Sequence, residues 1–343
     1  MPFVDHKYHM RALLVIAVAL FLGSCKPDQS RLAADNLSGT VLIINLGSEN
    51  KEAKSAKPEE DGGGLGTGFF VDDNLIVTNA HVVGGAKALK VYGYRDNKAY
   101  DAELIAADKK ADLAIIKVKD WKGFNAYVKP TILRWKDSRS VEVGDTVWAM
   151  GNPYGLVWTV SQGLVSHKLR QAKRDRSYYI QTTTPIYPGN SGGPLLDGQG
   201  YVIAVNSAIV GKEGYFGMSI PSNYAQKVVE DLRKDGKVNR ALIGIRISDS
   251  DDEHKVKVQK IEMSSASITA GLLPNDVIDA VKTSKTNKRW INIYDADDLI
   301  SETMLLSPGD MLDLRVLRDG DSRTFSFPVK GPTEDPSAAR TDR

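Results

Sequence analysis

Pro-Gly-Asn-Ser-Gly-Gly-Pro, residues 188–194, is the stretch from which the fold and chemistry of this chain are inferred. Glycines on both sides of Ser191 allow a sharp backbone course that turns main-chain N–H groups toward one point. The flanking prolines argue against a simple flexible linker. A serine hydroxyl is a poor nucleophile at neutral pH, so a nucleophilic role for Ser191 requires a base supplied from elsewhere in the chain.

Two other segments contain a candidate base and a candidate carboxylate. Thr-Asn-Ala-His at residues 78–81 follows an apolar run, and Ala-Asp-Leu-Ala at residues 111–114 opens another. Histidine titrates near neutrality, so His81 would accept the serine proton and return it to a leaving amine. Asp112 would hold the imidazole in the productive tautomer. The N–H groups of Gly189 and Ser191 would form an oxyanion hole, in which one donor is worth about a hundredfold or more in rate.

With these residues the chain resembles an HtrA/Deg-type serine protease. The resemblance implies an all-β chymotrypsin-like double β-barrel protease domain over residues 39–235, followed by a small α+β PDZ domain over residues 236–330. An inactive copy of the fold is the alternative, but such copies usually replace a triad residue, and none is replaced here. The matching segments are Gly-Thr-Gly-Phe at 66–69, Thr-Asn-Ala-His-Val-Val at 78–83, Asp-Leu-Ala at 112–114, Gly-Asn-Pro-Tyr-Gly at 151–155, and Gln-Thr through Gly-Asn-Ser-Gly-Gly-Pro at 181–194.

The distribution of apolar runs fits two small barrels packed together, with the triad at their junction. Short strand-like runs alternate with Gly/Pro turns, and helical periodicity is almost absent before a helix at residues 223–234, capped by Ser222 or Asn223 and ended by Gly236. Residues 47–64 have nothing to bury and are expected to form a mobile loop. The expected strands are residues 40–46, 69–71, 75–78, 89–94, 103–106, 113–118, 146–150, 163–166, 179–182 and 201–206.

The segment after the hinge at residues 235–240 has three PDZ-like features. Residues 271–278 match a PDZ turn in which Asn275 replaces the usual glycine, and asparagine tolerates the left-handed backbone. Asp295 would cap a helix that precedes an alternating strand. The alternative is an unrelated small α/β appendage, and the tail at residues 331–343 is expected to be disordered. The loop that would capture a peptide's terminal carboxylate is formed by Leu242, Ile243, Gly244 and Ile245.

The N-terminus resembles a bacterial lipoprotein precursor. Basic residues precede an apolar run at residues 12–22, which suits a signal peptide over residues 1–24. Leu-Gly-Ser-Cys at residues 22–25 ends on Cys25, the only cysteine of the chain, so no intramolecular disulfide is possible and lipidation is expected. Residues 25–38 would be a polar tether. Lys26 after the cysteine resembles an outer-membrane address, and an ordinary secreted precursor or an uncleaved anchor is the alternative.

Composition bounds the remaining possibilities. With 343 residues, 42% of them hydrophobic, the chain has room for two or three domains with buried cores. The net charge is +2, without a concentrated basic run, so nucleic acid is not an expected partner. No cofactor and no metal ion are implied.

The resemblance implies an ATP-independent endoprotease that acts on unfolded or damaged proteins in the cell envelope. Trypsin-like enzymes carry an aspartate six residues before the nucleophile, whereas this chain has Pro185, so we expect cleavage after small or medium apolar residues. The strand at residues 205–208, with Asn206, Ser207 and Ala208, would pair with substrate backbone.

The resemblance also implies regulation and assembly. Loops at residues 151–157, 181–189 and 208–217 would exchange between ordered and disordered states, and peptides bound to the PDZ domain or trimer formation would bias them. Two alternatives stay open at this point. One is a non-enzymatic PDZ-based sensor or chaperone, and the other is a dedicated protease that cleaves one signalling substrate.

Overall fold

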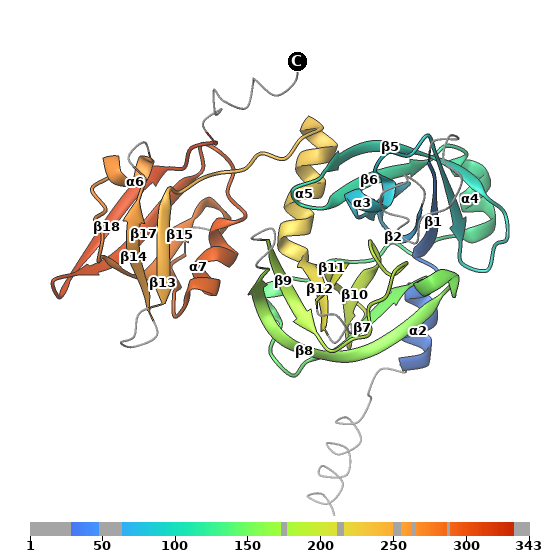
Figure 1. The fold of residues 1–343 in the computed structure, drawn as a ribbon, viewed down its shortest axis with the longest axis horizontal. Helices are drawn as coiled ribbons and strands as arrows, with labels where there is room; N and C mark the ends of the chain where they lie inside the picture. The colour runs from blue at the N-terminus through green and yellow to red at the C-terminus, as the bar shows by residue number, and fades with distance from the viewer. Residues whose placement is uncertain are drawn as a thin grey trace, which may run out of the picture.

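A computed structural model shows two β-barrels, a long helix that packs across them, and a smaller C-terminal domain (Figure 1). It describes residues 29–47, 64–172, 177–210, 216–249, 255–262, 265–286 and 289–332. The proposed signal peptide, Cys25, most of the loop at residues 47–64 and nearly all of the tail lie outside the described residues. None of the described helices is long and apolar enough to cross a membrane.

The first barrel closes six antiparallel strands in the order β1-β2-β3-β6-β5-β4. Phe70 is fully buried inside it, and its ring packs 5.6 Å from that of Phe124 on helix α4. The tight turn between β2 and β3 contains Asn74, which has a φ of +49°. Asparagine tolerates this left-handed backbone in turns. The elements are β1 (Thr40–Leu46), β2 (Gly64–Asp72), β3 (Leu75–Thr78), α3 (Ala80–Val83), β4 (Ala88–Gly93), β5 (Tyr100–Asp108), β6 (Leu113–Val118) and α4 (Trp121–Val128).

The second barrel closes in the order β10-β11-β12-β9-β8-β7. Its strand β8 is much longer than the four-residue strand expected from the sequence, because β8 pairs with β7 along one half and with β9 along the other. The elements are η1 (Ser138–Ser140), β7 (Thr146–Gly151), η2 (Pro153–Gly155), β8 (Thr159–Gln171), β9 (Tyr178–Thr182), β10 (Pro194–Asp197), β11 (Val202–Val210) and β12 (Phe216–Pro221).

Three helical features differ from the sequence-based expectations. Residues 29–37, expected only as part of a tether, form α2 (Gln29–Leu37), and the buried side chain of Leu37 joins the protease core. The helix α4 was not expected at all. The helix α5 (Ser222–Asp235) ends at Gly236 as predicted, but no side chain caps its N-terminus, because the Ser222 hydroxyl donates to the carbonyl of Lys136 instead.

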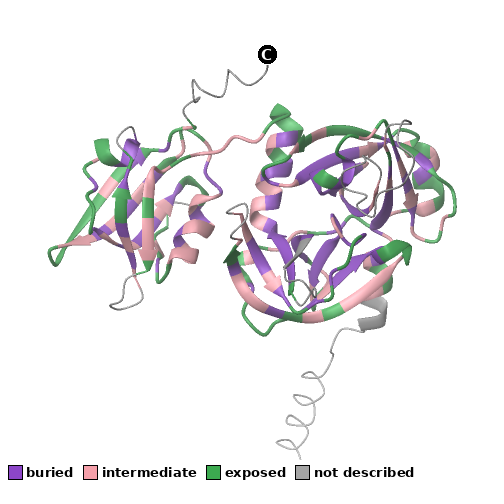
Figure 2. Cartoon of the chain, viewed as in Figure 1, coloured by how far each residue is buried: buried purple, intermediate pink, exposed green. Residues whose placement is uncertain are grey.

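Helix α5 and one hydrophobic cluster hold the two barrels together. The cluster joins Phe69 and Leu113 of the first barrel to Met150 and Val205 of the second, and Val228 of α5 packs against them. These five residues are fully buried, and Figure 2 shows buried residues along strands of both barrels and on α5. Burial of each such side chain contributes roughly 1.5–3 kcal/mol, so the relative position of the barrels is strongly determined.

The C-terminal domain is an antiparallel sheet in the order β13-β14-β15-β17-β18, with β16 beside β15. Asp295 caps α7 as predicted, since its carboxylate accepts a hydrogen bond from the N–H of Asp298 at 2.8 Å. Asn275 has φ +76°, so the left-handed backbone expected there is present. The elements are β13 (Ile245–Asp249), β14 (Val256–Ile261), α6 (Ala266–Thr269), β15 (Val277–Thr283), η3 (Ser284–Thr286), β16 (Ile291–Asn292), α7 (Ala296–Thr303), β17 (Met311–Arg318) and β18 (Asp321–Pro328).

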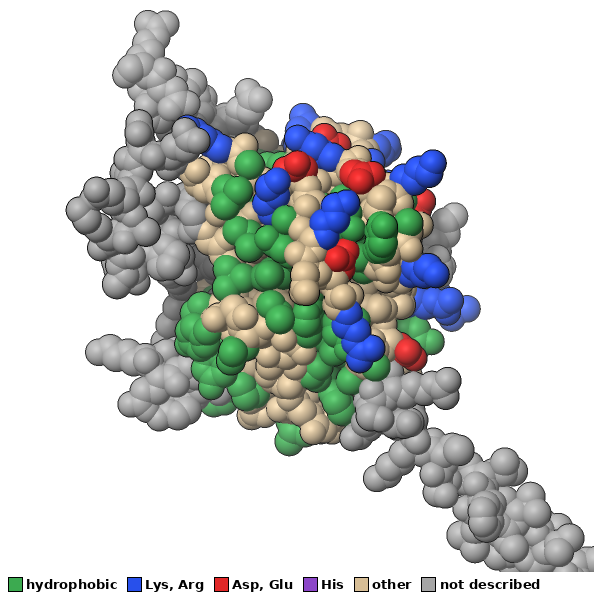
Figure 3. All heavy atoms as spheres, turned by 90° about the vertical axis from the view of Figure 1, so that its right-hand side faces the viewer, with side chains coloured by type: hydrophobic (Ala, Val, Ile, Leu, Met, Phe, Trp, Pro, Cys, Tyr) green, Lys and Arg blue, Asp and Glu red, His purple; other side chains and the backbone are tan. Residues whose placement is uncertain are grey.

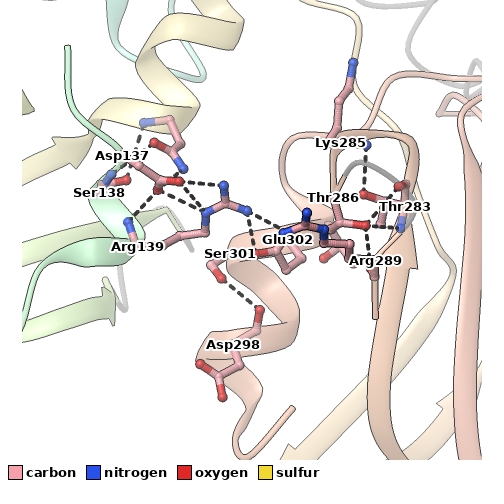
Figure 4. Close-up of polar contacts among 12 residues, drawn as sticks. Asp137, Ser138, Arg139, Thr283, Lys285, Thr286, Arg289, Asp298, Ser301 and Glu302 are labelled. Atoms are coloured by element: carbon pink, nitrogen blue, oxygen red, sulfur yellow. Dashed lines mark hydrogen bonds and ion pairs between the residues drawn. The ribbon is translucent and has the colours of Figure 1, made fainter. Parts of the chain in front are cut away.

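The two domains meet through an ion-pair cluster, the interdomain clasp, made of Asp137, Arg139 and Glu302 (Figure 4). The guanidinium of Arg139 donates to both oxygens of Glu302 on α7, at 2.7 and 2.9 Å. It also donates to Asp137, which in turn accepts from Asn223 at the start of α5. The Glu302 side chain is only 3% exposed, so it depends on Arg139 for its charge partner.

An acidic group at the start of α7 lies beside the clasp in the cavity between the domains. Burial, with the nearby charges of Asp295 and Asp249, raises the pKa of Asp297 to about 6. Facing it from β8 are His167, Lys168 and Arg170. Burial and the charge of Arg170 lower the pKa of His167 from 6.5. As the pH rises, the ionisation of Asp297, whose pKa is raised, lowers the stability of the folded protein. The deprotonation of His167, whose pKa is lowered, increases it.

The substitution Asp297→Asn should change how stability depends on pH. The unfolded Asp297 carboxyl titrates near 3.8 and the folded one near 6, so its stabilising proton is fully present below about pH 4 and is lost as the pH rises through 6. The variant should therefore have a Tm close to that of the wild type at about pH 4 and a higher Tm at about pH 7. Thermal unfolding across this range measures the difference.

Asp321→Asn is the matched control, because that side chain is 77% exposed on the same domain. His167 Nδ1 lies 3.8 Å from the Asp297 carboxylate, so the measured difference includes any change in the titration of His167. A constant difference in Tm between wild type and Asp297→Asn at all pH values would contradict the prediction.

Candidate active site

The structure brings His81 and Asp112 into direct contact. The short helix α3 begins immediately after β3 and turns the imidazole toward the start of β6. The Nδ1 atom of His81 is 2.9 Å from both carboxylate oxygens of Asp112, and the His81 backbone N–H donates to the same carboxylate at 3.1 Å. Since an ionised carboxylate only accepts hydrogen bonds, the proton lies on Nδ1 and Nε2 is left as the basic atom.

Asp112 is held in an unfavourable backbone conformation. Its φ is +52°, in the left-handed region that side-chain-bearing residues rarely adopt. The fully buried side chain of Asn79 stabilises this conformation, because its amide donates to the Asp112 carbonyl at 2.8 Å. The sequence-based interpretation did not assign a role to Asn79, although it lies two residues before His81.

The nucleophile and the carboxylate are linked across the barrel junction by Ser207. The Ser207 hydroxyl donates to the second carboxylate oxygen of Asp112 at 2.8 Å. The carbonyl of the same residue accepts a hydrogen bond from the Ser191 hydroxyl at 3.1 Å. Ser207 therefore contacts two candidate catalytic residues, in addition to lying on the strand expected to bind substrate.

The loop that carries Ser191 is tightly packed, and its glycines are required by that packing. Gly189 has φ +104°, and a Cβ there would collide with the carbonyl oxygen of Asn152. Gly192 has φ +82°, and a Cβ there would collide with Thr67 and Thr78. Among the described residues, none accepts a hydrogen bond from the N–H of Gly189 or Ser191.

The residues expected to bind substrate occupy different environments. Pro185 is exposed, whereas the next residue, Ile186, is 2% exposed and belongs to the core of the second barrel. Asn206 is fully buried, and its amide donates to the Pro194 carbonyl at 3.2 Å. Its backbone N–H donates to the carbonyl of Gly193, and its carbonyl accepts a hydrogen bond from the N–H of Gly192. Asn206 thus braces the nucleophile loop, and Ala208 follows a bulge in β11.

The expected carboxylate loop lies where β13 begins, at the edge of the C-terminal sheet. Gly244 has φ +73°, and a Cβ there would collide with Ser265. The N–H of Leu242 donates to the carbonyl of Lys330 at 2.7 Å, which anchors the loop to the chain beyond β18. Ile243 and Ile245 pack against the core of this domain. Within the described ranges, no group of three or more His, Cys, Asp and Glu residues is placed to hold a metal ion.

Comparison with known families agrees with this architecture. Residues 66–205 match the trypsin-like peptidase domain, and residues 241–329 match the PDZ domain. A probable periplasmic serine endoprotease, DegP-like, from Chlamydia trachomatis serovar D is 36% identical over 298 residues, covering 81% of this chain and 56% of the relative. One with the same name from Marinomonas sp. is 32% identical, covering 79% of this chain and 58% of the relative. The chain thus spans little more than half the length of these relatives.

Solved structures show the same fold. The HtrA-type protease AlgW with a tripeptide superimposes with a TM-score of 0.65 at 24% identity, covering 90% of this chain and 99% of that one. A serine endoprotease from Yersinia pestis superimposes with a TM-score of 0.55 at 25% identity, covering 89% and 98%. A double barrel of the trypsin type followed by a PDZ domain is therefore the fold of this chain.

Gly189→Ala should strongly reduce the reactivity of Ser191. The new methyl group would collide with the carbonyl oxygen of Asn152, and alanine disfavours the positive φ, so the loop must move. Displacing the N–H of Gly189 should slow labelling by a fluorophosphonate probe by about a hundredfold, the scale of one lost oxyanion donor. Labelling kinetics followed on gels measure the effect.

Gly198→Ala is the matched control, because nothing lies within 4 Å of a Cβ at that glycine. It should label at the wild-type rate. Equal labelling of wild type and Gly189→Ala would contradict the assignment of this loop.

Proposed function

The chain belongs to the HtrA/Deg-type family of trypsin-like peptidases with a C-terminal PDZ domain, and on that premise we propose that it is an ATP-independent serine endoprotease of the bacterial cell envelope. The single observation that carries the proposal is the contact of His81 Nδ1 with both oxygens of Asp112 at 2.9 Å. This pairing leaves Nε2 basic, as proton abstraction from a serine requires. The proposed substrates are unfolded or misfolded proteins.

The first half of the reaction would form an acyl-enzyme. As Ser191 Oγ attacks the scissile carbonyl carbon, its proton passes to Nε2 of His81, and Asp112 stabilises the resulting imidazolium. The N–H groups of Gly189 and Ser191 would stabilise the negative oxygen of the tetrahedral intermediate. His81 then protonates the leaving amine, the C–N bond breaks, and the ester with Ser191 remains.

The second half would hydrolyse that ester. His81 accepts a proton from water as the water oxygen attacks the ester carbon, and a second tetrahedral intermediate uses the same N–H groups. Its collapse returns the proton to Ser191 Oγ and releases the new carboxyl terminus. Support for this use of the loop comes from the Gly189 and Ser191 N–H groups, which donate to no other group among the described residues.

We propose that substrates bind through their main chain beside β11, near Ser207 and Ala208, and must therefore be locally unfolded. Exposed hydrophobic side chains on the loops of the second barrel support this type of substrate. Tyr154 and Tyr187 are 67% and 43% exposed, and their rings lie 5.6 Å apart beside the nucleophile loop. The absence of an acidic residue from Pro185 to Ser191 supports cleavage after apolar residues.

We propose that the PDZ domain binds C-terminal peptides and thereby regulates the protease. The free edge of β13 follows Gly244, so a peptide could add there as a strand with its carboxylate at the loop of residues 242–245. Helix α7 packs against β13 and also carries Glu302 of the interdomain clasp. A peptide between β13 and α7 would therefore act on the helix that contacts the protease domain.

We propose that the mature protein is anchored through lipid on Cys25 to the periplasmic side of a membrane, with the outer membrane suggested by Lys26. The relatives named periplasmic endoproteases support the compartment. We also propose homo-oligomers, with a trimer expected from the family. Figure 3 shows one face of the protease domain, with most of its charged side chains in the upper half and many hydrophobic side chains in the lower half. This hydrophobic surface supports association between subunits there.

The wild-type protein should cleave unfolded casein, and Ser191→Ala should not. Because alanine has no nucleophilic hydroxyl, the rate of casein cleavage by the variant should be at least about a thousandfold below that of the wild type, the scale seen when a residue of a Ser-His-Asp triad is removed. Release of fluorescent peptides from labelled casein by lipid-free protein measures turnover, and mapping of the cleaved bonds tests the preference for apolar residues.

Equal residual cleavage by wild type and Ser191→Ala would contradict the protease function and favour a sensor or chaperone. The same assay with peptides of varied C-termini tests regulation. Activity on casein without any peptide supports a general protease, whereas activity only after one matching peptide is added would indicate a dedicated signalling protease.

Cys25→Ser should release the protein from membranes. The acylated cysteine would be the only lipid attachment point, because the chain has no second cysteine. Fractionation of cells followed by immunoblotting measures the distribution of wild type and variant between membrane and soluble fractions. Unchanged membrane association of the variant would contradict lipid anchoring.

A further inference from the structure

Thr67 of the first barrel reaches across the junction and contacts the nucleophile loop twice. It lies on β2 and is fully buried. Its backbone N–H donates to the carbonyl of Ser191 at 2.9 Å, and its hydroxyl donates to the carbonyl of Gly189 at 2.6 Å. One residue of the first barrel therefore binds the loop, through its backbone and its side chain, at the two residues whose N–H groups would form the oxyanion hole.

The position of this hydroxyl is itself determined by its surroundings. The Thr67 carbonyl accepts from the Thr78 hydroxyl at 2.7 Å, and Thr67 pairs with Leu42 of β1. The hydroxyl oxygen accepts from the side-chain amide of Asn152 at 3.0 Å. A hydroxyl has a single proton, and with Asn152 as donor to its oxygen, that proton is directed to the Gly189 carbonyl.

The remaining carbonyls of the loop also have donors. The Pro188 carbonyl accepts from the N–H of Tyr154 at 2.8 Å, and the Asn190 carbonyl accepts from the N–H of Gly193 at 3.0 Å. The second donor to the Gly189 carbonyl is the N–H of Asn152, at the long distance of 3.4 Å. The Thr67 hydroxyl restrains the carbonyl end of the peptide group between Gly189 and Asn190, and the N–H of Asn190, which donates to the Tyr187 carbonyl at 2.9 Å, restrains its other end.

The N–H of Gly189 belongs to the preceding peptide group, so a shift of the peptide group between Gly189 and Asn190 would misplace that N–H through the Cα that the two groups share. The peptide groups on either side of Gly189 are planar and meet at its Cα, and glycine offers little steric resistance to rotation about its backbone bonds. We propose that the Thr67 hydroxyl is a positioning group for the oxyanion hole, which it maintains by holding the Gly189 carbonyl. The inference rests on the proposed protease function.

The test compares Thr67→Val, which has nearly the same shape without the hydroxyl, with Thr67→Ser, which keeps it. Thr67→Val should lower kcat on labelled casein by about tenfold to a hundredfold, with KM changed by less than about twofold, because misplacing a transition-state donor affects turnover rather than binding. Thr67→Ser should restore at least half of the wild-type kcat. Circular dichroism and thermal unfolding show whether each variant is folded.

A second readout does not depend on proteolysis. Phosphonylation of Ser191 by a fluorophosphonate also places an oxygen in the oxyanion hole, so Thr67→Val should slow labelling by a factor similar to that for kcat. If Thr67→Val does not fold, Asn152→Ala takes its place. That variant leaves Thr67 intact but removes the amide that orients its hydroxyl, and it should slow labelling in the same direction.

Wild-type rates in Thr67→Val, or equally slow rates in Thr67→Val and Thr67→Ser, would overturn the proposal while leaving the protease function intact. Casein cleavage that is the same in wild type and Ser191→Ala would instead contradict the proposed function. In that case the labelling rates alone decide whether Thr67 positions the loop.

Discussion

The candidate catalytic side chains are divided between two barrels, so the site exists only where the barrels are held in register. His81 and Asp112 belong to the first barrel, and Ser191 belongs to the second. The hydrogen bond from the Ser207 hydroxyl to the Asp112 carboxylate, at 2.8 Å, crosses the junction at that point. The contacts of Thr67 with the nucleophile loop cross it in the opposite direction. The shared hydrophobic cluster and α5 make the junction rigid enough for such short contacts to persist.

The junction contains several unusual local features. Asp112 has a left-handed backbone that the Asn79 amide stabilises, and Gly189 and Gly192 have positive φ values where no other residue would fit. The buried side-chain oxygen of Asn190 has no hydrogen-bond partner within the described residues. A left-handed backbone at a residue other than glycine, as at Asp112, costs of order 1–3 kcal/mol and persists only where the surrounding structure holds it.

The contact between the domains has a different character. Its main components are charges: Arg139 binds a nearly fully buried Glu302, and Asp297 has a raised pKa in the adjacent cavity. A buried pair of this kind contributes little net stability compared with apolar packing, but removal of one partner leaves an uncompensated charge. The orientation of the PDZ domain therefore depends on charge state and on the position of α7, whereas the orientation of the barrels depends on hydrophobic packing.

Elements whose signals are local could be predicted from the sequence. The apolar runs predicted most barrel strands to within a few residues, Gly236 and Asp295 marked two helix ends, and the motifs identified the residues that form the His81–Asp112 pair and the Ser191 loop. Local patterns also misled, since helix α4 was not expected and Ser222 caps nothing. The hydrogen bonds of Ser207 with Asp112, of Thr67 with Gly189 and of Arg139 with Glu302 could be known only from the folded protein. These partners lie 95, 122 and 163 positions apart, so no periodicity or spacing in one sequence encodes them, and they form only when barrel closure and domain docking bring them together.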